Sequence, residues 1–525
     1  MRLPVVSCAL ALLVAIATTA ATPTPAATKC FPPDFLFGSA TAAYQVEGGW
    51  NATGRTPSIW DDFCRAMPTL QCANVADDFV HRYKQDIALM VETGLSSFRF
   101  SVSWSRAMNW DPTARRMRPN ALGLAFYHDV IDTLLANGIA PILTLYHWDL
   151  PRELQLELDG WLNRDLADHF QEYADLLYRE YGAKVEYWST FNEPHSFVWG
   201  GYSRGMAPPA LPPSDTNAYI ATHNVLLAHA LAVQRFRALK SSNVIHANAK
   251  ISIVLNADFA YPLDPSNEAD VAAASRRMEF AVGWFLQPVV SGEYPAVMRE
   301  RSTIPCDSLP LGWDRDLGVD GSRMPDGARL ASPGPDGKPL CAWFSAYPEG
   351  YLETIRWLHK RDSAAPILLT ENGWCGNATI ENRDQLWYFQ SYLDQVHTAI
   401  TVDKIPVVGY TAWSFMDNYE WGSFQPRFGL YYVNYTQATG SKQGYTPLPT
   451  DLTRIPRTAA TWYAQVAKTK CIEVSGAVME DKTVVAVSTK AALIAFAVAV
   501  VGATAVVLLR RRRSTLGENE PLLRQ

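Results

Sequence analysis

The sequence predicts an α/β fold in which repeated β-α units build a parallel (β/α)8 barrel. Short apolar runs alternate with longer segments whose apolar residues recur every three or four positions, as expected of strands followed by helices. Several of these runs end in polar or aromatic residues, a pattern typical of the strand ends of such barrels. The chain has 525 residues and is 48% hydrophobic, enough for one large core, and barrels exceed the usual domain length.

The charge balance excludes one broad class of function. The chain has 46 basic and 52 acidic side chains, a net charge of -6, and no basic cluster outside a short C-terminal run. A nucleic-acid-binding protein would need such a cluster, and a disordered chain would be less hydrophobic. The 17 Trp, 23 Tyr and 21 Phe suit the stacking of flat apolar faces such as sugar rings, although a large core would use them as well.

The first 21 residues have the order of a secretory signal peptide. Arg2 precedes an apolar run from Val5 to Ala17, and small residues follow. We expect segment 1–21 to be removed. We expect the part of the chain that follows it to lie in an oxidising lumen or outside the cell.

Seven apolar runs are predicted strands of a barrel that occupies residues 31–470. They are Phe35–Ala43, Ser96–Trp104, Ala140–Trp148, Tyr187–Glu193, Ile251–Phe259, Pro366–Asn372 and Val407–Phe415. Predicted helices lie between them, at Asp77–Thr93, Leu122–Asn137, Leu166–Tyr181, Ala218–Leu239, Ala269–Val290 and Glu349–Lys360.

The region of the sixth strand is predicted to be missing or irregular. Between Thr303 and Leu340, Pro and Gly make up 12 of 38 residues, and no alternating apolar run occurs. Either this segment is a long irregular loop and the barrel closes unusually, or the sequence lacks a stretch that the functional protein has.

Polar and aromatic side chains follow four of the predicted strands. They are Gln45, His147, Trp148, Asn192, Glu193, Glu371 and Asn372. Because the C-terminal strand ends of a (β/α)8 barrel converge on one face, we expect these residues to form one site. A single one of them could be a buried core group or a helix cap, but four strand ends that behave alike favour a site.

Two glutamates stand out within this set. Pro194 ends the strand after Glu193, and Gly373 supplies the turn after Glu371, so both carboxylates are expected at the mouth of the barrel. Such a pair indicates glycoside hydrolysis, because cleaving an acetal needs an acid together with a nucleophile or base. No C-x-x-C or H-E-x-x-H pattern argues for a metal site, and no cofactor is expected.

Residues 31–466 resemble glycoside hydrolase family 1, the β-glucosidase family. The matching stretches, in family order, are FLFGSATAAYQVEG (35–48), FRFSVSWSR (98–106), YHWDLP (146–151), TFNEP (190–194), TENG (370–373) and WSFMDNYEW (413–421). The resemblance implies hydrolysis of terminal non-reducing β-D-glucosyl residues through a covalent glycosyl-enzyme.

The resemblance also assigns roles. Glu371 matches the nucleophile and Glu193 the acid/base, while Arg99 matches an arginine that orients the nucleophile and keeps it ionised. A purely structural ion pair is the alternative for Arg99. Burial and the negative partner are expected to raise the pKa of Glu193.

The sugar-binding residues follow from the same resemblance. Gln45, His147, Asn192 and Glu420 match residues that bind the sugar hydroxyls, and Trp413 and Trp421 match the platform and wall of the pocket. The carboxylate of Glu420 would repel a phosphate, so an unphosphorylated sugar is expected. Trp343 lies near the position of an aglycone-facing tryptophan. The family's sixth strand, which carries an Asn and a Tyr, has no match here.

Two alternatives share this family assignment. The chain could be a catalytically impaired member that serves as a membrane-anchored carbohydrate-binding or receptor ectodomain, or a transferase that uses the same glycosyl-enzyme. Both glutamates are present, which favours the enzyme, and the missing strand is the one feature that favours the impaired member.

The C-terminus predicts a membrane anchor. After a stalk at residues 471–490, Ala491–Leu509 forms 19 uncharged residues, which at 1.5 Å each nearly span a bilayer core of about 30 Å. Arg510–Arg513 would hold the following end in the cytosol, which predicts a single-pass type I protein. Within the tail 510–525, Glu518–Leu523 resembles a dileucine signal for clathrin adaptors, so endosome, lysosome, vacuole or plasma membrane are the expected locations.

Three sequons and seven cysteines lie on the predicted luminal side. Asn51, Asn377 and Asn434 are candidate glycosylation sites. The seven cysteines cannot all pair, and Cys64 and Cys72 are close enough for a local disulfide, while the other pairings stay open.

Overall fold

The structure, a computed structural model, describes residues 27–301 and 328–474. Residues Cys30–Ile472 form one compact unit, and a second unit contains residues 1–29 and 473–525. The predicted signal peptide, the span 491–509 and the tail 510–525 lie outside the described residues, as does nearly all of the stalk. Within the described ranges, no helix is both long and apolar enough to cross a membrane.

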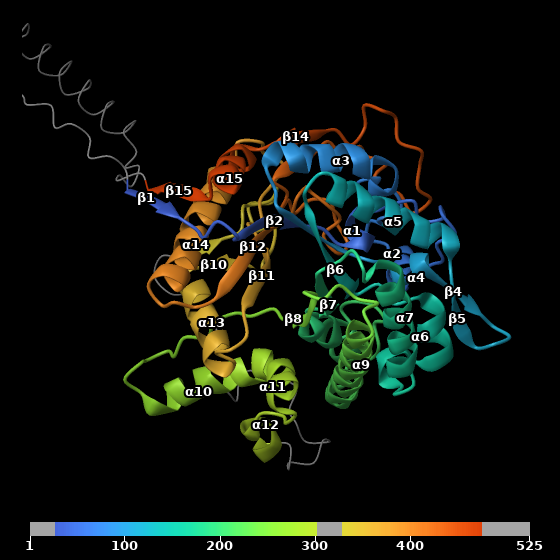
Figure 1. Ribbon diagram of the computed structural model, residues 1–525, viewed down its shortest axis with the longest axis horizontal. Coiled ribbons are helices and arrows are strands. Elements are labelled where there is room, and N and C mark those ends of the chain that lie inside the picture. The colour runs from blue at the N-terminus through green and yellow to red at the C-terminus, as the bar shows by residue number, and fades with distance from the viewer. Residues whose placement is uncertain (1–26, 302–327, 475–525) are drawn as a thin grey trace, which may run out of the picture. The chain divides into compact units, whose positions relative to one another are not determined.

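Seven parallel strands form the central sheet, and they confirm the seven predicted strands. They are β2 (Leu36–Ala40), β3 (Ser97–Ser101), β6 (Ala140–Tyr146), β7 (Tyr187–Asn192), β8 (Lys250–Val254), β11 (Ile367–Asn372) and β12 (Val407–Trp413). Their order is β11-β12-β2-β3-β6-β7-β8, so the last strand pairs with the first, as in a barrel (Figure 1).

The barrel is incomplete at one place in the described part of the chain. No strand there pairs with the outer edges of β8 and β11, which are the positions that flank a sixth strand. The described residues of the predicted irregular segment, from 328 onward, contain only β9 (Arg329–Leu330), which pairs antiparallel with β10 (Ser345–Ala346). The rest of that segment lies outside the described residues.

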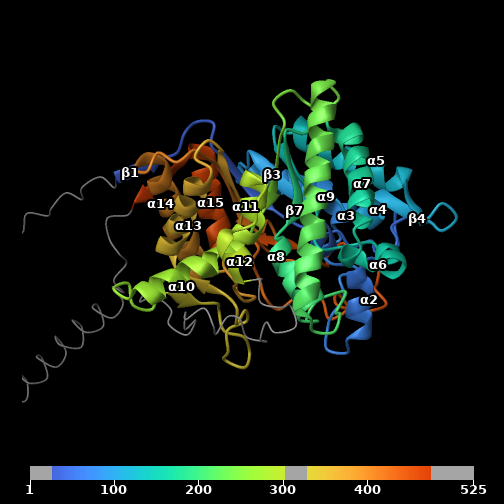
Figure 2. The same ribbon diagram turned by 90° about the horizontal axis from the view of Figure 1, so that it is seen from below.

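Amphipathic helices surround the sheet, because each one must bury an apolar face. They are α3 (Phe79–Thr93), α5 (Ala121–Ala136), α7 (Leu166–Tyr181), α9 (Asp215–Ser241), α13 (Pro348–Arg361), α14 (Arg383–Thr401) and α15 (Thr458–Thr469). Figure 2 shows α9 beside α7, on which it packs. Ser214 caps α9 by accepting a hydrogen bond from the Asn217 amide at 3.2 Å.

One predicted helix is wrong in detail. Instead of a single helix over Ala269–Val290, the structure has α10 (Glu268–Met278) and α11 (Trp284–Ser291), joined by a π-helical turn at Glu279–Gly283. The wider turn shifts the apolar face, which a constant 3.6-residue period does not anticipate. A short helix α12 (Ala296–Arg301) follows.

The described residues also form shorter elements that are not part of the parallel sheet. They are β1 (Ala27–Cys30), α1 (Ala43–Val46), α2 (Ile59–Ala66), α4 (Trp104–Ala107), β4 (Met108–Asp111), β5 (Arg116–Pro119), α6 (Arg152–Leu158), a 3-10 turn (Gly160–Leu162), α8 (Pro194–Phe197), a π turn (Val198–Ser203), β13 (Tyr431–Val433), β14 (Arg454–Pro456) and β15 (Cys471–Val474).

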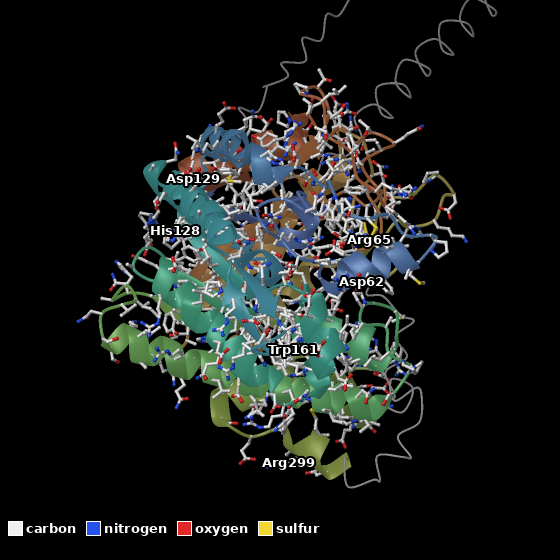
Figure 3. All side chains as sticks on the ribbon, turned by 90° about the vertical axis from the view of Figure 1, so that its right-hand side faces the viewer. Asp62, Arg65, His128, Asp129, Trp161 and Arg299 are labelled. Carbon is white, nitrogen blue, oxygen red and sulfur yellow. A yellow bond between two sulfur atoms is a disulfide. The ribbon has the colours of Figure 1, made fainter. Side chains whose placement is uncertain are left out.

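Three disulfides join the described residues. The predicted Cys64–Cys72 bond is confirmed, and it ties α2, where Figure 3 labels Asp62 and Arg65, to the following loop. The other two are Cys30–Cys471 and Cys341–Cys375, and Cys306 lies outside the described residues.

The alternation of side chains along β3 shows how the barrel separates its core from its polar interior. Phe98 and Phe100 are buried and stack on each other, and Phe98 also contacts Phe79 of α3. Arg99, between them, points the other way and meets residues of other strands. Period-two alternation therefore places an arginine inside the barrel.

The apolar shell is aromatic as well as aliphatic. Trp161, labelled in Figure 3, is fully buried, and its ring contacts Tyr146, Phe170 and Phe191. A large share of the aromatic residues therefore fills the core, and a smaller set lines the mouth of the barrel.

Candidate active site

Glu371 lies at the C-terminal end of β11, with its side chain 17% exposed. Arg99 Nη1 donates a hydrogen bond to Glu371 Oε1. The turn that follows requires a glycine, because a Cβ on Gly373 would lie 1.7 Å from the main-chain oxygen of Trp413. Strand β11 can therefore end against β12 with the carboxylate facing the barrel mouth.

Arg99 is almost fully buried, and side chains from β6 and β7 hold it in place. Its Nε donates to Thr144 Oγ1 at 3.0 Å, and its Nη2 donates to Asn192 Oδ1 at 2.8 Å. A buried guanidinium with all three nitrogens engaged has one orientation, and this orientation directs its charge at Glu371.

Glu193 follows β7 in a strained backbone conformation. Its φ of 43° and ψ of 61° lie in the left-handed region, which is costly for a residue other than glycine. Its amide donates to the Val254 carbonyl at 2.9 Å, and Ser196 Oγ donates to Glu193 Oε2 at 3.0 Å. Pro194 then begins α8, so the surrounding chain fixes the direction of the carboxylate.

The two carboxyl groups have different electrostatic surroundings. Burial, followed by the charge of Glu371, raises the pKa of Glu193 to about 8. Burial also raises the pKa of Glu371, but the charge and hydrogen bond of Arg99 oppose that rise. Since only Glu371 is in contact with the arginine, it is the member of the pair that ionises first.

Gln45 and Glu420 form the second polar cluster. Gln45 Nε2 donates to the Tyr419 carbonyl at 2.8 Å and to Asn418 Oδ1 at 3.0 Å, and it lies 3.4 Å from Glu420 Oε2. Gln45 Oε1 is buried and accepts no hydrogen bond from the described residues, so it can accept one from a ligand. Burial and then the charges of Glu371 and Glu193 raise the pKa of Glu420 to about 8.

His147 is a neutral member of the site. Burial and the nearby charge of Arg99 lower its pKa well below the usual value. Asn192 Nδ2 donates to His147 Nε2 at 3.1 Å, so the proton of the neutral ring resides on Nδ1. Asn192 thereby links His147 to Arg99.

Indole rings form one wall. Trp421 stacks on Trp148 with centroids 4.4 Å apart and packs against Trp60 at 4.6 Å. Trp413 lies nearly parallel to His147 at 6.0 Å. Trp148 and Trp421 both have positive φ values, 75° and 40°, so this wall is also built on strained backbone.

Several residues that support the site were not predicted. Thr144 contacts Arg99, and Ser196 contacts Glu193. In the sequence, Thr144 is marked only by its inward register on a strand, and Ser196 only by its place at the start of a helix. Trp60 comes from α2, far from any strand end. The Cys341–Cys375 bond, four residues beyond Glu371, could not be chosen among the open pairings.

The remaining predicted residues lie at or near the surface. Trp343 is 72% exposed and stacks at 6.4 Å on Phe428, which packs with Trp413 in an apolar cluster. It therefore stands on the rim beside the pocket wall. Of the candidate glycosylation sites, Asn51 and Asn434 are exposed and Asn377 is half-buried.

The chain matches one family of known proteins over most of its length. The family model described as Glycosyl hydrolase family 1 matches residues 27–307 and 337–472. The chain is 35% identical over 494 residues to Beta-glucosidase 42 of Arabidopsis thaliana, covering 83% of this chain and 94% of the relative.

Solved structures give the same result. The crystal structure of the rice Os3BGlu6 β-glucosidase has a TM-score of 0.70 at 31% identity, covering 83% of this chain and 98% of the rice chain. A mutant of that rice enzyme, with the same scores and coverage, is in a covalent complex with Glc.

Proposed function

Because this chain belongs to glycosyl hydrolase family 1 and is a retaining β-glycosidase of the β-glucosidase type, we propose that Glu371 is its nucleophile and Glu193 its acid/base. The observation that carries the proposal is the single arginine contact. Arg99 meets Glu371 and not Glu193, while burial beside that carboxylate keeps Glu193 protonated. Retaining hydrolysis needs these two protonation states.

The proposed reaction has two steps. The Glu371 carboxylate attacks the anomeric carbon while Glu193 gives its proton to the leaving oxygen, which forms a glycosyl-enzyme and frees the aglycone. Glu193, now ionised, takes a proton from water, and the hydroxide oxygen bonds to the anomeric carbon as Glu371 leaves. The product keeps the β configuration. The covalent Glc complex of the rice mutant supports such an intermediate.

We propose that the substrate carries an unphosphorylated terminal β-D-glucosyl residue. Gln45 Oε1 and Glu420 present acceptors, while Asn192 and His147 Nδ1 present donors to the sugar hydroxyls. Trp413 and Trp421 supply the apolar faces. A sugar phosphate would have to lie near the negative charge of Glu371, which already helps to raise the pKa values of Glu193 and Glu420.

Azide rescue tests the two roles separately. In Glu371→Gly, azide should replace the nucleophile in a single displacement and give an α-glycosyl azide. In Glu193→Ala, azide should attack the glycosyl-enzyme and give a β-glycosyl azide. Exchange of these two products, or wild-type turnover in either variant without azide, would refute the assignment.

We further propose that the protein is a single-pass type I membrane protein with its barrel luminal or extracellular. The support is the order of segments 1–21, 491–509 and 510–525 and the four arginines after the span. Glycans on Asn51, Asn377 and Asn434 and adaptor binding to the dileucine-like tail belong to the same proposal. Release of the protein from membranes by alkaline carbonate would contradict it.

A further inference from the structure

The nucleophile strand contains a β-bulge at the proposed nucleophile. Leu369 pairs with Tyr410 and Asn372 pairs with Ala412, so β11 advances three residues where β12 advances two. The extra residue falls at Thr370–Glu371. A bulge changes the direction of a side chain, and it also interrupts the ladder that would otherwise hold the strand in register.

The side chain of Asn372 is held at both ends immediately after this bulge. The hydroxyl of Tyr410, on β12, donates to Asn372 Oδ1 at 2.7 Å. Asn372 Nδ2 donates to the hydroxyl of Tyr388, on α14, at 2.9 Å. We call these three residues the amide clamp.

The two phenols of the amide clamp are fixed in their turn. Tyr388 stacks on Tyr392 with centroids 3.9 Å apart, and the Tyr410 ring lies 6.3 Å from that of Tyr463. Both phenols are buried, and burial raises their pKa values well above the usual value, so both hydroxyls stay neutral. The amide clamp therefore does not titrate together with the carboxyl groups of the site.

We propose that Asn372 is a positioning residue for the proposed reaction, and that Tyr388 and Tyr410 hold it so that the bulge presents Glu371 to the anomeric carbon. This inference rests on the proposed role of Glu371. Arg99 holds the Glu371 carboxylate and donates to the Thr370 carbonyl just before it at 3.5 Å, but its hydrogen bonds do not reach Asn372, which follows the bulge. In the described part of the chain β11 pairs only with β12, so the amide clamp supplies a second attachment, to α14.

The test compares variants that remove single hydroxyls. Tyr388→Phe and Tyr410→Phe each delete one arm of the amide clamp while keeping the buried ring, and Asn372→Ala deletes both arms. Tyr351→Phe is the matched control, because its ring packs on Tyr392 in the same aromatic cluster, with centroids 5.1 Å apart, and its hydroxyl makes no hydrogen bond to the three residues of the amide clamp.

The substrate is 2,4-dinitrophenyl β-glucoside, whose leaving group needs no proton, so Glu193 drops out of the measurement. A nucleophile misplaced by about 1 Å can lose on the order of 100-fold in rate. We expect kcat/KM to fall about 10-fold in each Phe variant and towards 100-fold in Asn372→Ala. Inhibition by glucose, which reports binding in the pocket, should change less than about twofold, and so should every kinetic constant of the control Tyr351→Phe.

Covalent labelling with 2-deoxy-2-fluoro-β-glucosyl fluoride separates the two hypotheses. Absence of label on Glu371 in the wild type would refute the proposed function itself. If the wild type is labelled there, unchanged labelling rates in Asn372→Ala would overturn the positioning role. A parallel weakening of glucose inhibition would also overturn it, because general disorder of the pocket would then explain the loss. The labelled fraction normalises each variant for correctly folded protein.

Discussion

The electrostatics of the site predict that Glu193 destabilises the folded protein at alkaline pH. Its pKa is about 4.5 in an unfolded chain and about 8 in the folded protein. A raised pKa contributes stability that is fully present below about 4.5 and is lost as the pH rises through about 8. Glu193→Gln mimics the protonated acid, so its effect should depend on pH.

The size of the effect follows from the shift. At 1.36 kcal/mol per pKa unit, a rise from about 4.5 to about 8 corresponds to an upper limit of about 5 kcal/mol. Glu193 is partly exposed, and solvent screening reduces that limit, so we expect Glu193→Gln to be about 2 kcal/mol more stable than the wild type at pH 9. At pH 4 the two proteins should unfold together.

The assay is the thermal unfolding midpoint of both proteins from pH 4 to pH 9. Glu381→Gln is the control, because Glu381 is an exposed carboxylate that makes no contact with the site. The wild-type and Glu193→Gln curves should separate between about pH 5 and pH 9, with Glu381→Gln following the wild type. Equal midpoints at pH 9, or a gain that is already complete at pH 4, would show that burial does not raise the pKa of Glu193.

Three further outcomes are expected. In the wild type, kcat/KM should fall above about pH 8, because Glu193 then loses its proton. Glu193→Ala should abolish this alkaline limb of the pH profile and should slow substrates with poor leaving groups by about 100-fold or more. An alkaline limb that is unchanged in Glu193→Ala would assign the limb to another group. Arg99→Gln should move the acid limb about 1–3 pH units upward, because Glu371 loses its cation; an unmoved limb would make the ion pair purely structural. Replacing both Cys341 and Cys375 by Ser should cost about 3 kcal/mol in unfolding titrations against oxidised wild-type protein, and an equally large loss measured against reduced wild-type protein would contradict the bond.

The sequence predicted the seven strands because barrel strands are apolar runs bounded by turn residues, a signal that depends on local pattern alone. It also brought Glu193, Glu371, Gln45 and His147 to one face, since parallel strand ends converge. Contacts set by tertiary geometry carried no such signal. The bond between Cys30 and Cys471 spans 441 residues, and no local pattern distinguishes this pairing from the others.

The strained backbone conformations at the site could not be predicted from the sequence either. The left-handed conformation of Glu193 depends on the Val254 carbonyl of the next strand and on Pro194 after it, so the sequence shows only one of the two causes. The bulge at Thr370–Glu371 likewise depends on the register between two strands. Both features concern the proposed catalytic pair, where local propensity and the final conformation are expected to disagree.

The gap in the sheet lies beside the strand whose position matters most. The strand ends that supply the proposed catalytic and sugar-binding residues belong to the continuous run β11-β12-β2-β3-β6-β7, and β8 supplies none of them. The unpaired edge of β8 in the described residues therefore involves none of the proposed ligands. At β11 the same gap leaves Glu371 on a strand that pairs on one edge only in the described residues. Besides the ladder with β12, the amide clamp and Arg99 hold β11 next to Glu371. Losing both should therefore reduce kcat/KM by more than the product of the single losses.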